Sequence, residues 1–159
     1  MGRIEERLAE LGLQLPAPVT APAGGELPFA LVRVSGALAH IAGHGPFDGT
    51  ELLFRGKLGR DLAPEDGLEA ARATALSMLA SLKQELGDLD RVSRWVKVLG
   101  FVNCAPGFSQ TPAVLNGFTD LVVELWGPDA GLHARSAIGV AELPFDMPVE
   151  LEAVAEIAE

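Results

Sequence analysis

The sequence predicts an α+β domain in which about six strands form one sheet and two long helices cover one of its faces. The first observation behind this prediction is the order of periodic segments, which reads helix, strand, strand, helix, strand, helix, strand, strand. The second is the helical spacing of apolar residues over 64–86 and 110–126, and the third is the two-residue alternation over 148–157. The chain has 159 residues, of which 48% are apolar, so we expect a single domain over 1–159.

The N-terminal part predicts a helix followed by a connector. Ile4, Leu8 and Leu11 fall on one face of a short amphipathic helix over 3–11. The next stretch is rich in proline, glycine and alanine, a composition that forbids a helix and suits a segment laid along a surface. We therefore expect residues 1–27 to form an extension and residues 28–159 to form the core.

A hairpin and a loop come next. Residues 29–35 and 37–42 predict two strands, and Gly36 between them favours a tight turn. The segment 43–59 contains five glycines and predicts a loop with room for one short strand. Long loops at the end of a strand often carry functional residues.

Both long helices carry start or stop signals. Pro64 suits the first turn of the helix over 64–86, and Gly87 suits its C-terminal end. The helix over 110–126 is stopped by the pair Gly127–Pro128.

The strand over 91–103 is expected at the centre of the sheet, because both of its predicted faces are mostly apolar. Strict alternation assigns Trp95, Lys97, Leu99 and Phe101 to one face and Val96, Val98 and Val102 to the other.

Two final strands are predicted over 133–142 and 148–157. In the last one, Val149, Leu151, Ala153, Ala155 and Ile157 point to one face, whereas Glu150, Glu152, Val154 and Glu156 point to the other. Because both long helices are expected on one face of the sheet, the other face is left uncovered although it carries apolar side chains. Covering it with a second copy of the chain predicts a homo-oligomer.

Composition limits the partners. The chain has 22 acidic and 12 basic side chains and a formal charge of -10, which argues against a nucleic-acid surface and against docking on anionic membranes. One basic pocket for a small anion stays possible. The single cysteine, Cys104, permits neither an intramolecular disulfide nor a cysteine-based zinc cluster. The charged N-terminus does not resemble a secretory signal, and no apolar run is long enough to span a membrane, so we expect a cytoplasmic protein.

Arg135 and the acidic row of the last strand are the first candidates for chemistry. Arg135 lies between small residues on the strand over 133–142, which we expect to be adjacent to the last strand with Glu152. Its side chain is suited to binding a carboxylate through two parallel hydrogen bonds. Two interpretations remain open for it, a ligand site and an Arg–Glu pair that only ties two strands together. The glutamates are either solvated or placed at an interface. At an interface each carboxylate needs a partner of opposite charge or a functional role.

The histidines and the cysteine carry weaker signals. His40 and His44 lie at a strand end, where their spacing does not suit a shared metal ion. His133 could line the same site as Arg135, or act only as a hydrogen-bonding group at its edge. Cys104 has no neighbouring His or cation and is interpreted as a small core residue.

Three segments resemble the RidA/YjgF family of reactive-intermediate (enamine/imine) deaminases. The C-terminal segment ARSAIGVAELPFDMPVELEA, residues 134–153, resembles the family signature. The segments LAHIAGHGP, residues 38–46, and VLNGF, residues 114–118, correspond further upstream. The resemblance covers roughly 27–158 and points to a longer branch of the family.

The resemblance implies a chorismate-mutase-like fold with a mixed sheet, assembled as a homotrimer with sites between subunits. It also implies hydrolysis of a small 2-enamine or 2-imine carboxylate to a 2-keto acid and ammonia, with no metal and no organic cofactor. An imine carbon is already electrophilic, so a positioned water beside a carboxylate base supplies most of the catalysis.

Residue roles follow from the same resemblance. Arg135 would hold the substrate carboxylate, and Glu152 would deprotonate the attacking water. Gly43 would lend a backbone group to the pocket, and Asn116 would line it from the second long helix. Two further family positions near the pocket, a tyrosine and a cysteine, correspond here to Phe29 and Ala137.

The absence of that hydroxyl and that thiol supports an alternative of the same fold, a non-catalytic module that binds small carboxylates and regulates a partner. The ribonuclease label attached to some family members is disfavoured by the acidic charge.

Overall fold

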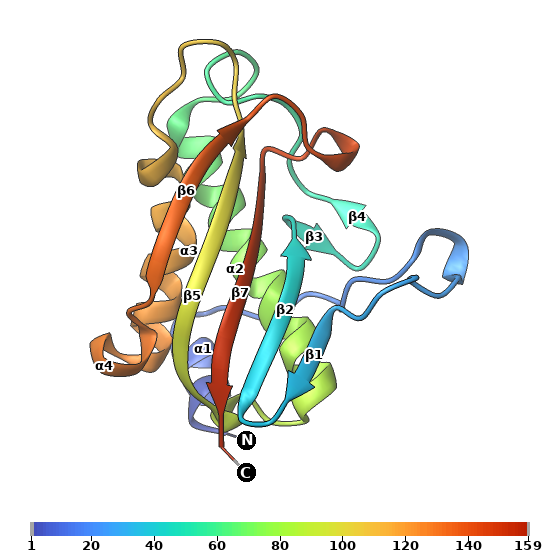
Figure 1. Cartoon of the computed structure of the whole chain (residues 1–159), viewed down its shortest axis with the longest axis vertical. Coiled ribbons are helices and arrows are strands. Elements are labelled where there is room, and N and C mark those ends of the chain that lie inside the picture. Colours follow the sequence, from blue (N-terminus) through green and yellow to red (C-terminus); the bar gives the residue numbers. More distant parts are fainter. Residues whose placement is uncertain (1, 159) are drawn as a thin grey trace.

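The structure, a computed structural model, describes residues 2–158 and confirms the α+β class with one mixed sheet (Figure 1). The five strands of this sheet lie in the order β1, β2, β7, β5, β6, with bounds Val32–Ser35, Leu38–His44, Val149–Ile157, Val92–Asn103 and Ala134–Val140. β5 and β6 run parallel, and the other neighbours run antiparallel. The strands β3 (Phe47–Asp48) and β4 (Glu51–Leu52) form a separate hairpin, so the expected sixth strand does not join the main sheet.

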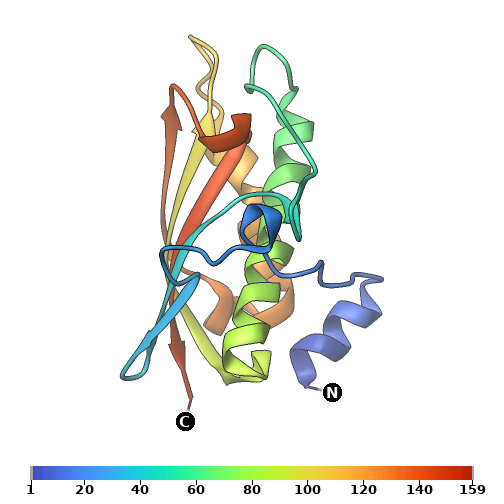
Figure 2. The same ribbon diagram turned by 90° about the vertical axis from the view of Figure 1, so that its right-hand side faces the viewer.

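The helices form two further layers. α2 (Pro64–Leu86) and α3 (Thr111–Trp126) cover one face of the sheet, as predicted, and α1 (Arg3–Glu10) lies on the far side of these helices (Figure 2). A short helix, α4 (Pro128–Gly131), follows α3, because Pro128 stops one helix and begins the next. Single 3₁₀ turns occupy Pro22–Gly24, Leu89–Arg91 and Pro144–Asp146.

Local signals set the ends of α2. Asp66 accepts a hydrogen bond from the backbone N–H of Ala63 at 2.9 Å, which satisfies one of the donors left over at the start of the helix. Gly87 ends the helix with a positive φ of 79°, a conformation that costs glycine little. Both ends agree with the sequence prediction because such signals act over only a few residues.

Carboxylates attach the N-terminal helix to the rest of the molecule. Asp90 accepts hydrogen bonds from the backbone N–H groups of Arg3 at 2.7 Å and of Ile4 at 2.9 Å. Glu5 also forms an ion pair with Lys83 of α2. These contacts, together with burial of Ile4, attach the extension to the helical layer.

The strand β7 confirms the predicted alternation. Its apolar row is buried against the helices, and Glu152 and Glu156 are exposed on the opposite face, which we call the outer face. For β5 the strict alternation is wrong. The register shifts between Trp95 and Lys97, so Trp95 joins Val98 on the buried face while Lys97 and Leu99 turn outward. An extra residue in one strand exchanges the two faces to which the preceding side chains of that strand point.

The outer face carries apolar side chains that no helix within residues 2–158 covers. Leu99, Phe101 and Val154 are half-buried or exposed there, and Ile138 of β6 is 45% exposed. This arrangement agrees with the sequence expectation that the second face of the sheet is apolar.

Candidate functional site

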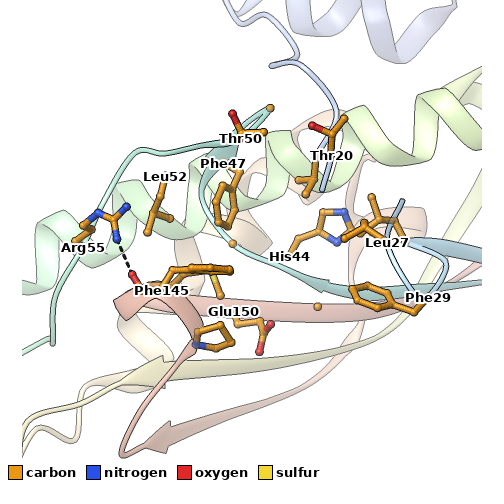
Figure 3. A pocket seen from close by; sticks show the side chains of 17 residues that line it. Thr20, Leu27, Phe29, His44, Phe47, Thr50, Leu52, Arg55, Phe145 and Glu150 are labelled. Carbon is orange, nitrogen blue, oxygen red and sulfur yellow. Dashed lines mark hydrogen bonds between the residues drawn. The ribbon is translucent and has the colours of Figure 1, made fainter. Parts of the chain in front are cut away.

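A cavity of about 400 Å³ lies where β2 ends. The connector before β1, the β3–β4 hairpin and the loop before β7 enclose it (Figure 3). Its lining is mostly apolar and includes two charged side chains, Glu150 and Arg55. A concave, largely apolar site with a few polar groups is the usual form of a small-molecule pocket.

Glu150 projects from β7 at one end of this cavity, and a bulge in β2 brings Gly43 against it. The pairing register of β2 with β7 shifts between Ile41 and His44, which displaces Gly43. A methyl group on Gly43 would lie 2.7 Å from Oε1 of Glu150, so only glycine permits this approach. The carboxyl group therefore lies directly beside an accessible backbone.

The environment of Glu150 favours its protonated form. Burial is the larger cause, and the negative charge of Glu152 on the same face is the smaller; both raise the pKa of Glu150. A carboxyl group perturbed by burial within a cavity is a candidate for acid–base chemistry.

Phe29 lies in the loop before β1 rather than within the strand predicted over 29–35, which begins at Val32. Phe29 lines the cavity and is 56% exposed. In Figure 3 the rings of Phe29 and Phe145 flank Glu150. The structure thus brings two predicted site residues, Phe29 and Gly43, to one cavity.

A second cluster surrounds Arg135 at the edge strand β6. Its Nη1 group donates to Oδ1 of Asn116 and to Oγ1 of Thr119, both at 3.0 Å, and Nη2 donates to the carbonyl of Pro112 at 3.3 Å. All three acceptors belong to α3. Arg135 and Asn116, predicted to line one site, are therefore in direct contact.

His133 extends this cluster. Its Nδ1 group donates to the carbonyl of Gly131 at 2.8 Å, so Nε2 accepts from the hydroxyl of Thr119 at 3.0 Å. Burial lowers the pKa of His133; the Gly131 hydrogen bond opposes this effect and the charge of Arg135 adds to it. The neutral ring helps to orient the hydroxyl that accepts from Arg135.

Ala137 lies two residues beyond Arg135 on the same face of β6. Its carbonyl accepts a hydrogen bond from Oγ1 of Thr111 at 3.2 Å. Ala137 thus belongs to the Arg135 cluster and not to the cavity lining.

The expectation that Arg135 and Glu152 occupy adjacent strands is wrong. β5 lies between β6 and β7, because β6 pairs in parallel with β5 and β7 pairs with its other edge. Arg135 pairs in register with Val98, which faces the helices, whereas Glu152 pairs with Leu99 on the outer face. Within one chain the two side chains therefore point to opposite sides of the sheet.

Sequence reasoning missed two charged or aromatic residues of the cavity, Arg55 and Phe145, and it counted Glu150 in the acidic row without giving it a role of its own. Glu152 received the role of base, yet it is exposed and does not line the cavity. Alternation places both glutamates on one face, and only the bulge at Gly43 selects Glu150. Phe145 carried no sequence signal, because its unusual backbone conformation does not follow from its residue type.

The two remaining histidines and the cysteine differ in how far they are buried. His44 is buried; its Nδ1 group donates to the carbonyl of Ala42 at 2.7 Å, and Nε2 accepts from Oγ of Ser81 at 2.9 Å. His40, by contrast, is exposed on the outer face. Cys104 is partly buried, and burial raises the pKa of its thiol.

The sequence matches the model of the YjgF/chorismate mutase-like family, whose description also carries the name endoribonuclease, over residues 5–156. The chain belongs to the YjgF/chorismate mutase-like family. This membership agrees with the resemblance found in the sequence and with the mixed sheet backed by two helices. Across residues 2–158, no helix combines the length and apolar character needed to cross a membrane.

Relatives match this YjgF-family chain over nearly its whole length. Protein TCP17 of Trypanosoma cruzi is 40% identical over 156 residues, which is 98% of this chain and 95% of that protein. The Agrobacterium tumefaciens protein Atu1372, described as having unknown function, is 35% identical with a TM-score of 0.88, over 98% of this chain and 93% of that one. Escherichia coli TdcF, crystallised with bound serine, shares the fold at 19% identity and a TM-score of 0.61, over 91% and 96%.

Proposed function

We propose that this protein hydrolyses 2-imino acids to 2-keto acids and ammonia at a site formed between two copies of the chain. The observation that carries the proposal is the half-buried carboxyl group of Glu150 beside Gly43 in an apolar cavity. The serine bound by TdcF has a carboxylate next to a carbon that bears nitrogen, as a 2-imino acid does. Membership of the same family supports a small-molecule ligand of this class.

Glu150 takes the role of base that the sequence assigned to Glu152. Its carboxylate accepts a proton from a water molecule while the water oxygen forms a bond to the imine carbon. The proton then passes to the nitrogen, which gives a carbinolamine. The same carboxylate next transfers the hydroxyl proton to the nitrogen, the carbon–oxygen double bond forms as the carbon–nitrogen bond breaks, and ammonia leaves a 2-keto acid. The raised pKa of Glu150 suits this task, because a more basic carboxylate takes the proton more readily.

Arg135 takes the role of carboxylate holder. A guanidinium has five N–H donors, and three of those on Arg135 are used by Asn116, Thr119 and Pro112. Among residues 2–158, the donor on Nε and one on Nη2 have no acceptor, and two neighbouring donors match the two oxygens of a carboxylate. The contacts with α3 hold the guanidinium in position for this pairing.

The proposal requires a second copy because Arg135 and Glu150 face opposite sides of one sheet. A copy packed on the apolar outer face would cover Phe101 and Ile138 and could present its own Arg135 to the cavity. A trimer, which closes with three equivalent sites, satisfies this arrangement.

The direct test measures hydrolysis of 2-iminopropionate through reduction of the released pyruvate, above the spontaneous rate. We expect Glu150→Gln to lower kcat/KM about 100-fold or more, and the matched variant Glu152→Gln to lower it less than about fivefold. Arg135→Ala should raise KM and lower kcat/KM about 10- to 100-fold, because a charge-assisted pair is lost. Equal activity in the wild type and in both Glu150→Gln and Arg135→Ala would refute the proposal.

The same assay separates catalysis from binding alone. A protein that is thermally stabilised by pyruvate but does not accelerate hydrolysis would be a carboxylate-binding module rather than an enzyme.

A further inference from the structure

We infer that the cavity beside Glu150 receives the side chain of the substrate, and that the enzyme prefers 2-imino acids with bulky aliphatic or aromatic side chains over the imine of alanine. The inference rests on the proposed function and specifies its substrate class. It is carried by the composition of the cavity and by the conformation of one residue at its mouth.

The walls of the cavity are mostly apolar. They include Leu27, Phe29, Leu31, Phe47, Leu52 and Phe145. The volume of about 400 Å³ exceeds what a methyl group fills, and an apolar cavity gains affinity with each carbon atom that enters it. A substrate with a methyl side chain would leave most of this apolar surface in contact with water.

Phe145 is held at the cavity mouth in a conformation that phenylalanine avoids. Its φ is 58° and that of Asp146 is 60°, so two successive residues other than glycine lie in the left-handed region. Such backbone costs free energy and persists where surrounding contacts impose it, often at functional sites. Phe145 nevertheless stays 65% exposed, so the strain is not offset by burial within the chain.

Two contacts hold Phe145 in place. Nη1 of Arg55 donates to its carbonyl at 2.8 Å, and its ring meets that of Phe47 edge to face at a centroid distance of 6.3 Å. Arg55 thereby acts as a positioning residue for Phe145. A bound apolar side chain packed against Phe145 would cover the exposed part of its ring.

The charged groups of the cavity allow a second interpretation of the substrate class, in which the substrate side chain is charged. Arg55 is exposed, and its guanidinium could instead meet a second carboxylate on the substrate. The lining argues against this, because a charged side chain would lose its hydration against apolar walls beside Glu150. The imine of glutamate therefore belongs in the test.

The test compares imines generated in situ by an amino acid oxidase from alanine, leucine, phenylalanine and glutamate. We expect kcat/KM for the leucine or phenylalanine imine to exceed that for the alanine imine at least about tenfold, with the glutamate imine poorest. Leu52→Ala and Phe145→Ala should each reduce the preference about fivefold or more.

Two further variants make the test specific. Leu53 is the matched control, since it follows Leu52, is 46% exposed and does not line the cavity, so Leu53→Ala should keep the preference. Thr50→Trp, which places a ring at the end of the cavity away from Glu150 in Figure 3, should abolish the preference by filling the space. Equal rates for all imines, a preference for the glutamate imine, or a preference unaffected by these variants would overturn the inference.

Binding of the matching 2-keto acids, measured by calorimetry, separates this inference from the proposed function. If no imine is hydrolysed, the proposed reaction fails. Tighter binding of phenylpyruvate than of pyruvate, weakened by Phe145→Ala and not by Leu53→Ala, would still support the side-chain cavity. Equal binding of the two acids would overturn it.

Discussion

At the scale of single residues, the difference between Glu150 and Glu152 depends on one glycine. Both glutamates belong to the same face of β7, and periodicity alone cannot choose between them. The register shift in β2 makes the choice by moving Gly43 against Glu150. A bulge depends on pairing between distant segments, so the sequence predicted the face of the carboxylate but not its identity.

We expect Gly43→Ala to reduce imine hydrolysis about tenfold or more while leaving the melting temperature within about 3 °C of the wild type. The added methyl would overlap the flexible end of the Glu150 side chain, which can swing away, and not a fixed part of the backbone. Kinetics and thermal unfolding of the same preparation check this. Unchanged activity would show that the contact between Gly43 and Glu150 has no part in catalysis.

Two histidines, the buried His44 and the half-buried His133, make stability depend on pH. Burial lowers the pKa of His44 and of His133 below the unfolded value of about 6.5. As pH falls below about 6.5 the unfolded chain binds protons first, so stability present above that pH is lost as pH falls through the folded pKa values. We expect a lower urea midpoint at about pH 5.5 than at about pH 7.5.

The control for this pH dependence is His44→Gln, which keeps an acceptor for the Ser81 hydroxyl but does not titrate. It should flatten the slope of stability against pH. The same slope in the variant and the wild type would exclude His44 as a source.

At the scale of elements, prediction succeeded where local signals decide. The ends of α2 follow from Pro64 and Gly87, and the facing of β7 follows from its alternation. It failed where pairing between distant segments decides, as at the bulge near Trp95 and in the position of β6. The residues of a strand do not by themselves determine which position in the sheet that strand will occupy.

The contact between α2 and α3 depends on a glycine that the sequence did not single out. A methyl group on Gly117 would collide with the backbone carbonyl of Leu68 in α2, which cannot rotate away. We expect Gly117→Ala to destabilise the protein by about 1–3 kcal/mol through separation of the two helices. Urea unfolding measures this, and an equal or higher stability of Gly117→Ala would contradict the close packing.

At the scale of the whole molecule, the two groups of residues to which we assign the proposed reaction lie on two sides of one chain. The cavity with Gly43 and Glu150 lies at the end of β2, and the Arg135 cluster lies at the opposite edge strand, β6. The uncovered apolar face, predicted from the sequence, lies between these edges. The central claim is therefore that one copy supplies Arg135 and its neighbour supplies Glu150.

Co-expression of Arg135→Ala with Glu150→Gln tests this claim most directly. Each variant alone should retain at most about a tenth of the wild-type kcat/KM, but a mixed oligomer would contain intact sites wherever a Glu150→Gln chain supplies Arg135 to an Arg135→Ala chain. With equal amounts and random assembly, about one quarter of the sites, and so about a quarter of the wild-type activity, should return. Mixed oligomers that form but stay as inactive as the separate variants would contradict a site shared between copies.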